Sequence, residues 1–216
     1  MYLQNKTVLF LGDSITEGVG VSAPEKNYVS VFRELSGANV VNYGVSGTRI
    51  AKTRHPSEDA GWDQCFLLRA DDMQKDADVV VVFGSTNDFG HGTADLGTFA
   101  SRDVYTFYGA LHLLCRKLLS RYPCAEIVFL TPLHRVGETD PCNELGLERP
   151  PLAEYAEAIR RVVAYYGLPV LDLFRTSGLQ PDVACIRELY MPDGLHPSDP
   201  GAARIAQRLY AFLQSL

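Results

Sequence analysis

Residues 7 to 14, with the sequence TVLFLGDS, join an apolar run to a tight polar turn. A short apolar run that ends at Gly and Asp is typical of a strand buried on both faces of a sheet, since such a strand carries apolar side chains on both sides. Further runs of this kind follow at residues 39–43, 78–83, 126–131 and 169–174. The sequence therefore predicts five strands, the first of which covers residues 7–11.

Longer amphipathic stretches separate these apolar runs. They predict helices over residues 28–35, 62–74, 103–121, 152–166 and 200–216. Because each helix must return the chain to the same end of the sheet, this alternation predicts a parallel sheet covered by helices on both faces. The expected fold is α/β, a flavodoxin-like three-layer sandwich with a five-stranded parallel sheet.

Length and composition limit the classes of protein to which the chain can belong. Its 216 residues fit one domain, residues 1–216, because a single core serves chains of up to about 250 residues. A content of 46% hydrophobic and 21% charged residues excludes intrinsic disorder as the main state. The net charge of −6 offers no general attraction to nucleic acid or to an anionic membrane, so we expect neither as a partner.

The location of the protein is suggested by its apolar runs and its cysteines. Apolar runs such as residues 79–83 are far shorter than the about 20 residues of a membrane-spanning helix. The first residues lack the apolar region of a signal peptide. The five cysteines are odd in number and widely spaced, without a Cys-x-x-Cys pair. We expect reduced thiols and a soluble, cytoplasmic protein.

Polar residues gather directly after the predicted strands. Residues 12–14 (GDS), 44–49 (GVSGTR) and 84–88 (GSTND) follow the first three strands, and a long polar loop, residues 132–151, follows the fourth. Residues 191–197 (MPDGLHP) lie beyond the fifth. Because ligands bind at the carboxyl ends of parallel strands, these segments should converge on one crest that holds the site.

Ser14 and the pair Asp193 and His196 are candidates for catalysis. Alone, each has a structural explanation, because Gly-Asp-Ser favours a turn or a helix N-cap and Asp-x-x-His can be a surface turn. Together they match a serine nucleophile, a base that takes its proton and an acid group that orients the base. Gly47 could offer a backbone N–H and Asn87 a side-chain amide to a developing oxyanion. These residue types are the ones that a serine hydrolase needs.

These candidates stand in four ordered blocks that resemble the SGNH hydrolases, also called GDSL lipases or esterases, over nearly the whole chain. The blocks are Gly12-Asp13-Ser14-Ile15-Thr16, Asn42-Tyr43-Gly44-Val45-Ser46-Gly47, Thr86-Asn87-Asp88 and Asp193-Gly194-Leu195-His196-Pro197. The resemblance implies a catalytic triad with Ser14 as nucleophile, His196 as base and Asp193 as its orienting group. It also implies an oxyanion hole made by the N–H groups of Ser14 and Gly47 and the amide of Asn87.

The chain departs from the family pattern at two positions. Ile15 stands where Leu is usual, which is a conservative apolar change. Ser85 stands where Gly is common, two residues before the Asn, and it is preceded by Gly84. Because a Ser side chain tolerates fewer backbone conformations than Gly, this departure concerns the backbone angle at Ser85 and not the role of Asn87.

Several other interpretations are disfavoured by the sequence. Residues 18–23 (GVGVSA) superficially match a dinucleotide-binding fingerprint, but they run into Pro24 instead of opening a helix. No G-x-S-x-G motif of an ordinary α/β-hydrolase is present. The remaining histidines show no metal-ligand spacing and are expected in loops or on helix surfaces: His55, His91, His112 and His134. We therefore expect no metal and no cofactor.

The loops around the predicted site carry residues that could contact a substrate. We expect contributions from Asp13, Arg49, Trp62, Phe89 and His134. The loops are polar with a few aromatic residues and lack the long apolar stretch of a lipid-binding lid. The expected partner is a small, water-soluble ester with a short acyl chain, and an acylated sugar is one candidate.

The sequence thus predicts a cytoplasmic serine esterase that works through an acyl-enzyme. Two alternatives stay open. The first is a lysophospholipase or thioesterase-type acylhydrolase on the same fold. The second is a non-catalytic, flavodoxin-like binding module whose Gly- and Ser-rich crest holds a phosphate or a cofactor.

Overall fold

The computed structural model describes all 216 residues and contains one five-stranded parallel sheet. The strands are β1 (Thr7–Gly12), β2 (Asn39–Gly44), β3 (Val79–Phe83), β4 (Glu126–Leu130) and β5 (Val170–Leu171). They lie in the order β2-β1-β3-β4-β5, and every neighbouring pair is parallel. This is the flavodoxin-like strand order, so the predicted fold class is confirmed.

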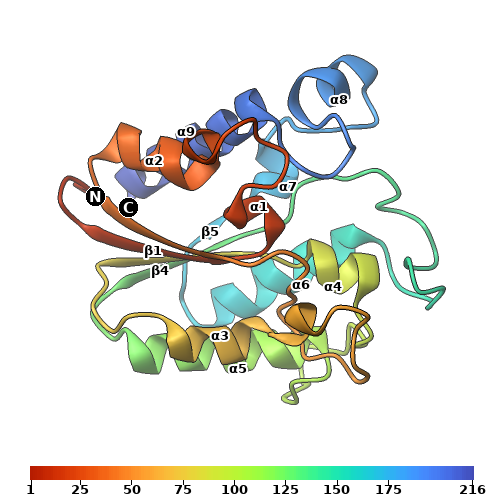
Figure 1. The fold of residues 1–216 in the computed structure, drawn as a ribbon. Helices are drawn as coiled ribbons and strands as arrows, with labels where there is room; N and C mark the ends of the chain where they lie inside the picture. The colour runs from red at the N-terminus through yellow and green to blue at the C-terminus, as the bar shows by residue number, and fades with distance from the viewer.

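Helices cover both faces of the sheet (Figure 1). One face carries α2 (Tyr28–Ser36) and α9 (Asp199–Ser215), and the other carries α3 (Phe66–Asp72), α5 (Phe107–Arg121) and α6 (Leu152–Tyr165). Side chains of β3 alternate between two apolar cores, Val80 and Val82 on one face and Val79, Val81 and Phe83 on the other. This period of two follows from the pleat of a strand and explains why a buried strand is apolar throughout.

Short helices gather at the carboxyl ends of the strands, toward the right of Figure 1. They are α1 (Ser14–Glu17), α4 (Thr86–His91), α7 (Leu173–Thr176), α8 (Ala184–Tyr190) and two 3₁₀ turns, η1 (Pro24–Lys26) and η2 (Ala60–Asp63). Helices α1 and α4 begin almost directly after β1 and β3, so they present their first residues at the crest of the sheet. None of the helices in this fold is both long and apolar enough to cross a bilayer.

The structure corrects several expected boundaries. Strand β5 has only two residues, because Asp172 caps α7 by accepting a hydrogen bond from the N–H of Arg175. The helix expected over residues 62–74 is divided into η2 and α3. Strand β2 lies at the edge of the sheet and is partly exposed, whereas we expected burial on both faces. The expected helix over residues 103–121 begins only at Phe107.

Candidate active site

Ser14 lies at the start of α1, where the chain turns sharply out of β1. Asp13 caps this helix, and its carboxylate accepts the N–H of Ile15 at 3.0 Å. A Cβ atom at Gly12 would lie 1.9 Å from Thr16 Oγ1, so only glycine lets α1 fold back this closely against the strand. The Gly-Asp-Ser sequence is therefore both the turn and the cap that the sequence suggested, and it places Ser14 at the crest.

Ser14, His196 and Asp193 form a continuous hydrogen-bonded chain. Ser14 Oγ lies 3.0 Å from His196 Nε2, although the two residues are 182 positions apart in sequence. His196 Nδ1 lies 2.7 Å from Asp193 Oδ2. With the imidazole proton on Nδ1, directed at the carboxylate, the lone pair of Nε2 faces the hydroxyl of Ser14. This is the arrangement of nucleophile, base and orienting acid.

The carboxylate of Asp193 is fixed by its own loop. Its Oδ1 accepts the backbone N–H groups of Leu195 at 2.8 Å and His196 at 2.7 Å. Burial alone would raise the pKa of Asp193, but these hydrogen bonds and the contact with the His196 ring outweigh it and lower the pKa. Asp193 therefore stays ionised and holds the imidazole in one orientation.

Neighbouring loops pack against the loop that carries Asp193 and His196. Gly20, with φ of 96°, approaches His196 so closely that a Cβ atom there would lie 2.8 Å from the His196 Cβ. On the other side, the N–H of Val136 donates to the carbonyl of Gly194 at 2.9 Å. The loop of residues 132–151 thus contacts the segment of Gly194, and the loop after α1 contacts His196.

The loop after β2 and the start of α4 meet on the opposite side of Ser14. Gly47 has a left-handed φ of 73°. The preceding Ser46 donates its backbone N–H to Glu17 Oε2 at 2.7 Å and its hydroxyl to the same oxygen. Asn87 Nδ2 donates one hydrogen to the Thr48 carbonyl at 3.0 Å, and its other amide hydrogen has no protein partner. These contacts leave donors of Gly47 and Asn87 free for a substrate oxygen.

Asp88 links α4 to the loop after β2. Its buried carboxylate accepts the N–H of Ile50 at 3.0 Å and the N–H of Ala51 at 2.8 Å. Burial raises the pKa of Asp88 to about 6 despite these hydrogen bonds. Neither Asp88 nor Glu17 is a site residue by sequence reasoning; Asp88 follows Asn87 in its motif block, and Glu17 lies directly after the block of Ser14.

Ser85 adopts the backbone conformation that glycine favours. Its φ is 97°, and only one other non-glycine residue, Asn5, has a positive φ. The Ser85 side chain is 1% exposed, makes no capping bond to α4, and leaves its hydroxyl without a hydrogen-bond partner. The departure from the family pattern therefore strains the backbone at Ser85 while Asn87 keeps its place.

Arg49 lies beneath the site and not on its surface. The side chain is 2% exposed. Its guanidinium donates to the Trp62 carbonyl at 3.1 Å, to Asp63 Oδ1 at 3.0 Å and to Ser57 Oγ at 2.6 Å, and it also contacts His91. Arg49 holds the loop that presents Trp62, and it also lines a small cavity beside Trp62, so its contact with a substrate stays a prediction.

Two further substrate-contact candidates are also buried. Asp13 is buried next to Ser14, and burial raises its pKa to about 7. Phe89 is 0% exposed, and its ring packs edge-on against Tyr155 and under the guanidinium of Arg149. Neither side chain can touch a substrate in this arrangement, so both expectations are corrected. Each side chain contributes to the packing below the site.

Trp62 and His134 remain at the surface, and only Trp62 lies beside the oxyanion side. A Cβ atom at Gly47 would lie 2.1 Å from Trp62 Cδ1, so the indole covers this glycine. His134 Nδ1 bonds both oxygens of Glu138 at 2.9 Å, and its ring lies 4.0 Å from that of Phe174. The hydrogen bond that His134 donates to Glu138, together with the negative charge of Glu138, raises the pKa of His134.

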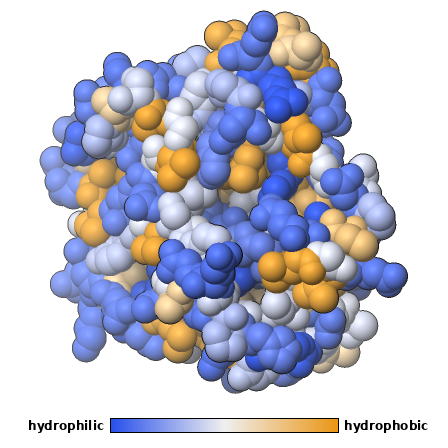
Figure 2. Space-filling model, turned by 45° about the vertical axis from the view of Figure 1, so that its right-hand side comes forward, coloured by the Kyte–Doolittle hydropathy of each residue, from blue (hydrophilic) through white to orange (hydrophobic).

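Two other expectations about side chains need correction. His112, expected on a helix surface, is fully buried in α5 and bonds the Tyr166 hydroxyl at 3.1 Å and the Phe99 carbonyl at 3.0 Å. The polar loops also carry exposed apolar side chains, among them Val45 and Val136. Figure 2 shows such apolar patches as separate areas divided by hydrophilic surface, without one continuous apolar groove on this face.

Comparisons with solved structures support the fold. A structure from Lactobacillus plantarum is 29% identical, with a TM-score of 0.83 and coverage of 99% of this chain and 98% of that chain. The acetyl xylan esterase AlAXEase is 24% identical, with a TM-score of 0.66 and coverage of 95% and 98%. A lipase/acylhydrolase from Enterococcus faecalis is 21% identical, with a TM-score of 0.65 and coverage of 97% and 96%.

Comparison with protein families gives the assignment. A search of curated proteins finds no match. The model of the GDSL-like lipase/acylhydrolase family matches residues 10–204, a range that includes Ser14, Gly47, Asn87, Asp193 and His196. Since this match covers most of the 216 residues, the chain belongs to the GDSL-like lipase/acylhydrolase family of hydrolases.

Proposed function

We propose that this protein is a serine ester hydrolase that cleaves short-chain carboxylic esters through an acyl-enzyme. The observation that carries the proposal is the chain of hydrogen bonds from Ser14 through His196 to Asp193. A free amide hydrogen of Asn87 and the left-handed turn at Gly47 also support the proposal. A phosphate- or cofactor-binding module has no need of this triad.

In the proposed reaction, Ser14 Oγ forms a bond to the ester carbonyl carbon while His196 Nε2 takes its proton. Asp193 stabilises the resulting imidazolium. The N–H groups of Ser14 and Gly47 and the amide of Asn87 donate to the tetrahedral oxyanion. When the intermediate collapses, the ester C–O bond breaks and His196 returns the proton to the leaving alcohol. Water then releases the acyl group by the same steps, and no cofactor takes part.

A short acyl chain suits the surface around this triad. Each buried CH₂ group contributes about 0.8 kcal/mol, so an enzyme for long chains needs a continuous apolar groove. The apolar patches on the face shown in Figure 2 are instead divided by hydrophilic surface. We expect kcat/KM to be highest for acetyl or propionyl esters in a p-nitrophenyl series from acetate to decanoate. An optimum at eight or more carbons would favour the lysophospholipase or thioesterase alternative.

Catalysis by Ser14 is tested by substitution. Ser14→Ala should lower kcat by about 10⁴- to 10⁶-fold, the loss typical of a triad member. Ser120→Ala is a matched control, because Ser120 lies exposed near the end of α5 and makes no side-chain hydrogen bond. A mass increase equal to the acyl group on the wild type, absent from Ser14→Ala, would identify the acyl-enzyme. Retention of more than a tenth of the activity in Ser14→Ala would contradict the assignment.

The alcohol part and the location belong to the same proposal. A structural neighbour is an acetyl xylan esterase, which supports an acylated sugar as the substrate class. The cysteines Cys65, Cys115, Cys124, Cys142 and Cys185 are all unpaired, which supports a reducing cytoplasmic location. Activity on acetylated saccharides and fractionation of the native cells test these two points.

A further inference from the structure

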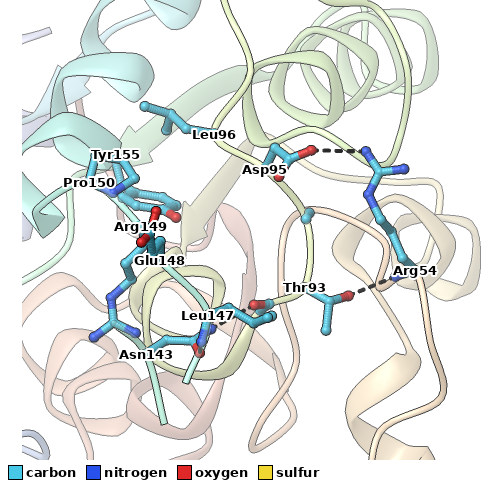
Figure 3. Close-up of a pocket in the computed structure, with 12 residues that line it drawn as sticks. Arg54, Thr93, Asp95, Leu96, Asn143, Leu147, Glu148, Arg149, Pro150 and Tyr155 are labelled. Carbon is cyan, nitrogen blue, oxygen red and sulfur yellow. Dashed lines mark hydrogen bonds and ion pairs between the residues drawn. The ribbon is translucent and has the colours of Figure 1, made fainter. Parts of the chain in front are cut away.

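A polar cavity of about 470 Å³ lies beyond the end of α4, where Gly92 begins its wall. Figure 3 shows the residues that line it. Its walls come from residues 92–96, from residues 143–150 of the long polar loop, and from Arg54 and Tyr155. This volume falls within the range of about 300 to 1,000 Å³ that is usual for small-molecule sites. Neither Ser14 nor His196 lines the cavity, so it is separate from the triad.

Tyr155 presents an unpartnered hydroxyl to this cavity. The residue is 2% exposed, lines the cavity, and makes no hydrogen bond to the protein through its hydroxyl. Figure 3 shows the hydroxyl directed toward the open space beside Glu148. Burial raises the pKa of Tyr155, so the hydroxyl stays protonated and can donate. Because this hydroxyl faces the cavity and has no protein partner, it is free to donate a hydrogen bond to a ligand oxygen.

The charges around the cavity are balanced. Arg54 and Arg149 carry positive charge, and Asp95 and Glu148 carry negative charge. Arg54 pairs with Asp95 at 3.2 Å, whereas no ion pair involves Glu148. The guanidinium of Arg149 lies 3.7 Å from the ring centre of Phe89, and its Nε and Nη1 have no hydrogen-bond partner. Balanced charge and the unpaired carboxylate of Glu148 favour a neutral, hydroxyl-rich ligand over a phosphate or a fatty acid.

A smaller cavity lies between this region and Trp62, the residue that covers Gly47. It has a volume of about 110 Å³, and Trp62 and His91 are among its lining residues. Thr93 lines both cavities, so they are neighbours along one side of α4. Trp62 in turn packs against Gly47, whose N–H faces the oxyanion in the proposed mechanism. Asn87 is the second residue of α4 and Gly92 directly follows the helix, so a rise of about 7.5 Å along α4 separates Asn87 from the first residue of the larger cavity.

The smaller cavity also offers free donors. Arg49 donates to His91 Nδ1 at 3.1 Å, because a guanidinium has no acceptor. Burial and the positive charge of Arg49 lower the pKa of His91 to about 4, so its single proton lies on Nε2. Neither His91 Nε2 nor the indole N–H of Trp62 bonds a protein atom, and the two rings lie 4.8 Å apart. Such a site combines a flat apolar ring with N–H donors, which suits the face and the hydroxyls of a sugar.

We propose that the two cavities form one cleft for the alcohol part of the substrate, and that this part is a neutral oligosaccharide. The acylated sugar would lie at Trp62, and a further sugar unit would bond the Tyr155 hydroxyl. The inference rests on the proposed esterase function and specifies its leaving group. A leaving group of one ring would leave the larger cavity empty.

Hydrolysis of three substrates tests this cleft: p-nitrophenyl acetate, acetylated xylose and acetylated xylotriose. The wild type should prefer the trisaccharide. Tyr155→Phe should lower kcat/KM for the trisaccharide by about 3- to 10-fold, mainly through KM, because one hydrogen bond is lost. It should leave p-nitrophenyl acetate unchanged. Glu148→Gln should act in the same direction. Tyr165→Phe is the matched control, since Tyr165 also belongs to α6 but is 61% exposed and outside both cavities.

Direct binding separates failure of the cleft from failure of the esterase function. Calorimetric titration of the Ser14→Ala protein with xylotriose, cellotriose, maltotriose and chitotriose needs no catalysis. We expect binding of at least one trisaccharide, weakened by an added Tyr155→Phe but not by Tyr165→Phe. Hydrolysis of p-nitrophenyl acetate without any trisaccharide binding overturns the cleft and leaves the esterase standing. Trisaccharide binding without hydrolysis of any ester overturns the esterase and leaves the cleft standing. Equal effects of the two tyrosine variants also overturn the cleft.

Discussion

Replacing Ser85 with glycine should stabilise this protein. Ser85 directly precedes α4, the helix that carries Asn87, and it has a left-handed φ of 97°. Its buried hydroxyl has no hydrogen-bond partner. Glycine adopts this backbone conformation without the clash of a Cβ atom and carries no hydroxyl to desolvate.

The size of the effect follows from three contributions. The left-handed conformation costs a residue other than glycine about 1 to 2 kcal/mol. An unpartnered buried hydroxyl costs about 1 to 3 kcal/mol. Against these gains, glycine loses more backbone entropy on folding, which costs about 0.5 to 1 kcal/mol. Since the site can relax in part, we expect Ser85→Gly to raise the free energy of unfolding by about 1 to 2 kcal/mol, which shifts Tm upward by about 2 to 8 °C in a chain of this length.

Urea unfolding and thermal melts of three variants measure the effect. Ser85→Ala removes the hydroxyl but keeps the Cβ atom, so it should gain less stability than Ser85→Gly. Asn5→Gly is the matched control, because Asn5 also has a positive φ, of 63°, but asparagine tolerates this region well. The esterase kcat of Ser85→Gly should stay close to wild type, since Asn87 keeps its bond to Thr48.

Two results would refute this reasoning. If Ser85→Gly lowers the Tm, the serine side chain makes a stabilising contact that outweighs the strain. If Ser85→Ala and Ser85→Gly gain equally, the desolvated hydroxyl and not the backbone conformation is the source of the cost.

Three further predictions concern the site. Asn87→Ala should lower kcat by about 10²- to 10³-fold with little change in KM, because the amide bonds the oxyanion most strongly in the transition state. Steady-state kinetics on p-nitrophenyl acetate checks this. A rise in KM at constant kcat would make Asn87 a substrate-binding residue instead. Glu17→Ala should lower kcat by about 10-fold by releasing the turn of Ser46 and Gly47, whereas Glu17→Gln keeps an acceptor for the Ser46 N–H and should retain most of the rate. Burial raises the pKa of Asp13 to about 7, above its value in the unfolded chain, so the free energy of unfolding should fall as pH rises from about 4 to 7. Asp13→Asn should remove part of that fall in urea titrations at several pH values, the rest coming from Asp88, whose pKa is also raised.

The sequence alone was sufficient for the architecture. Apolar runs such as residues 79–83, alternating with amphipathic stretches, identified all five strands and the long helices, because periodicity is a local property of the chain. The contact between Asp193 and His196 was also local, since the two residues are three positions apart. The ends of strands and helices were harder to predict where a side-chain cap stops an element, as the capping of α7 by Asp172 does for β5.

What only the tertiary structure decided is which side chains reach the surface and which residues from distant loops meet. Ser14 and His196 are 182 residues apart, and their contact depends on the packing of two loops at the crest. Arg49 and Phe89 looked suited to a substrate by residue type, yet Arg49 is bound by the Trp62 loop and Phe89 lies under Arg149. The position of Trp62 against Gly47 could not be foreseen either. Local sequence patterns indicate the periodicity of a strand or a helix. Burial and contacts between loops depend instead on how separate elements pack, and no short stretch of the sequence shows that packing.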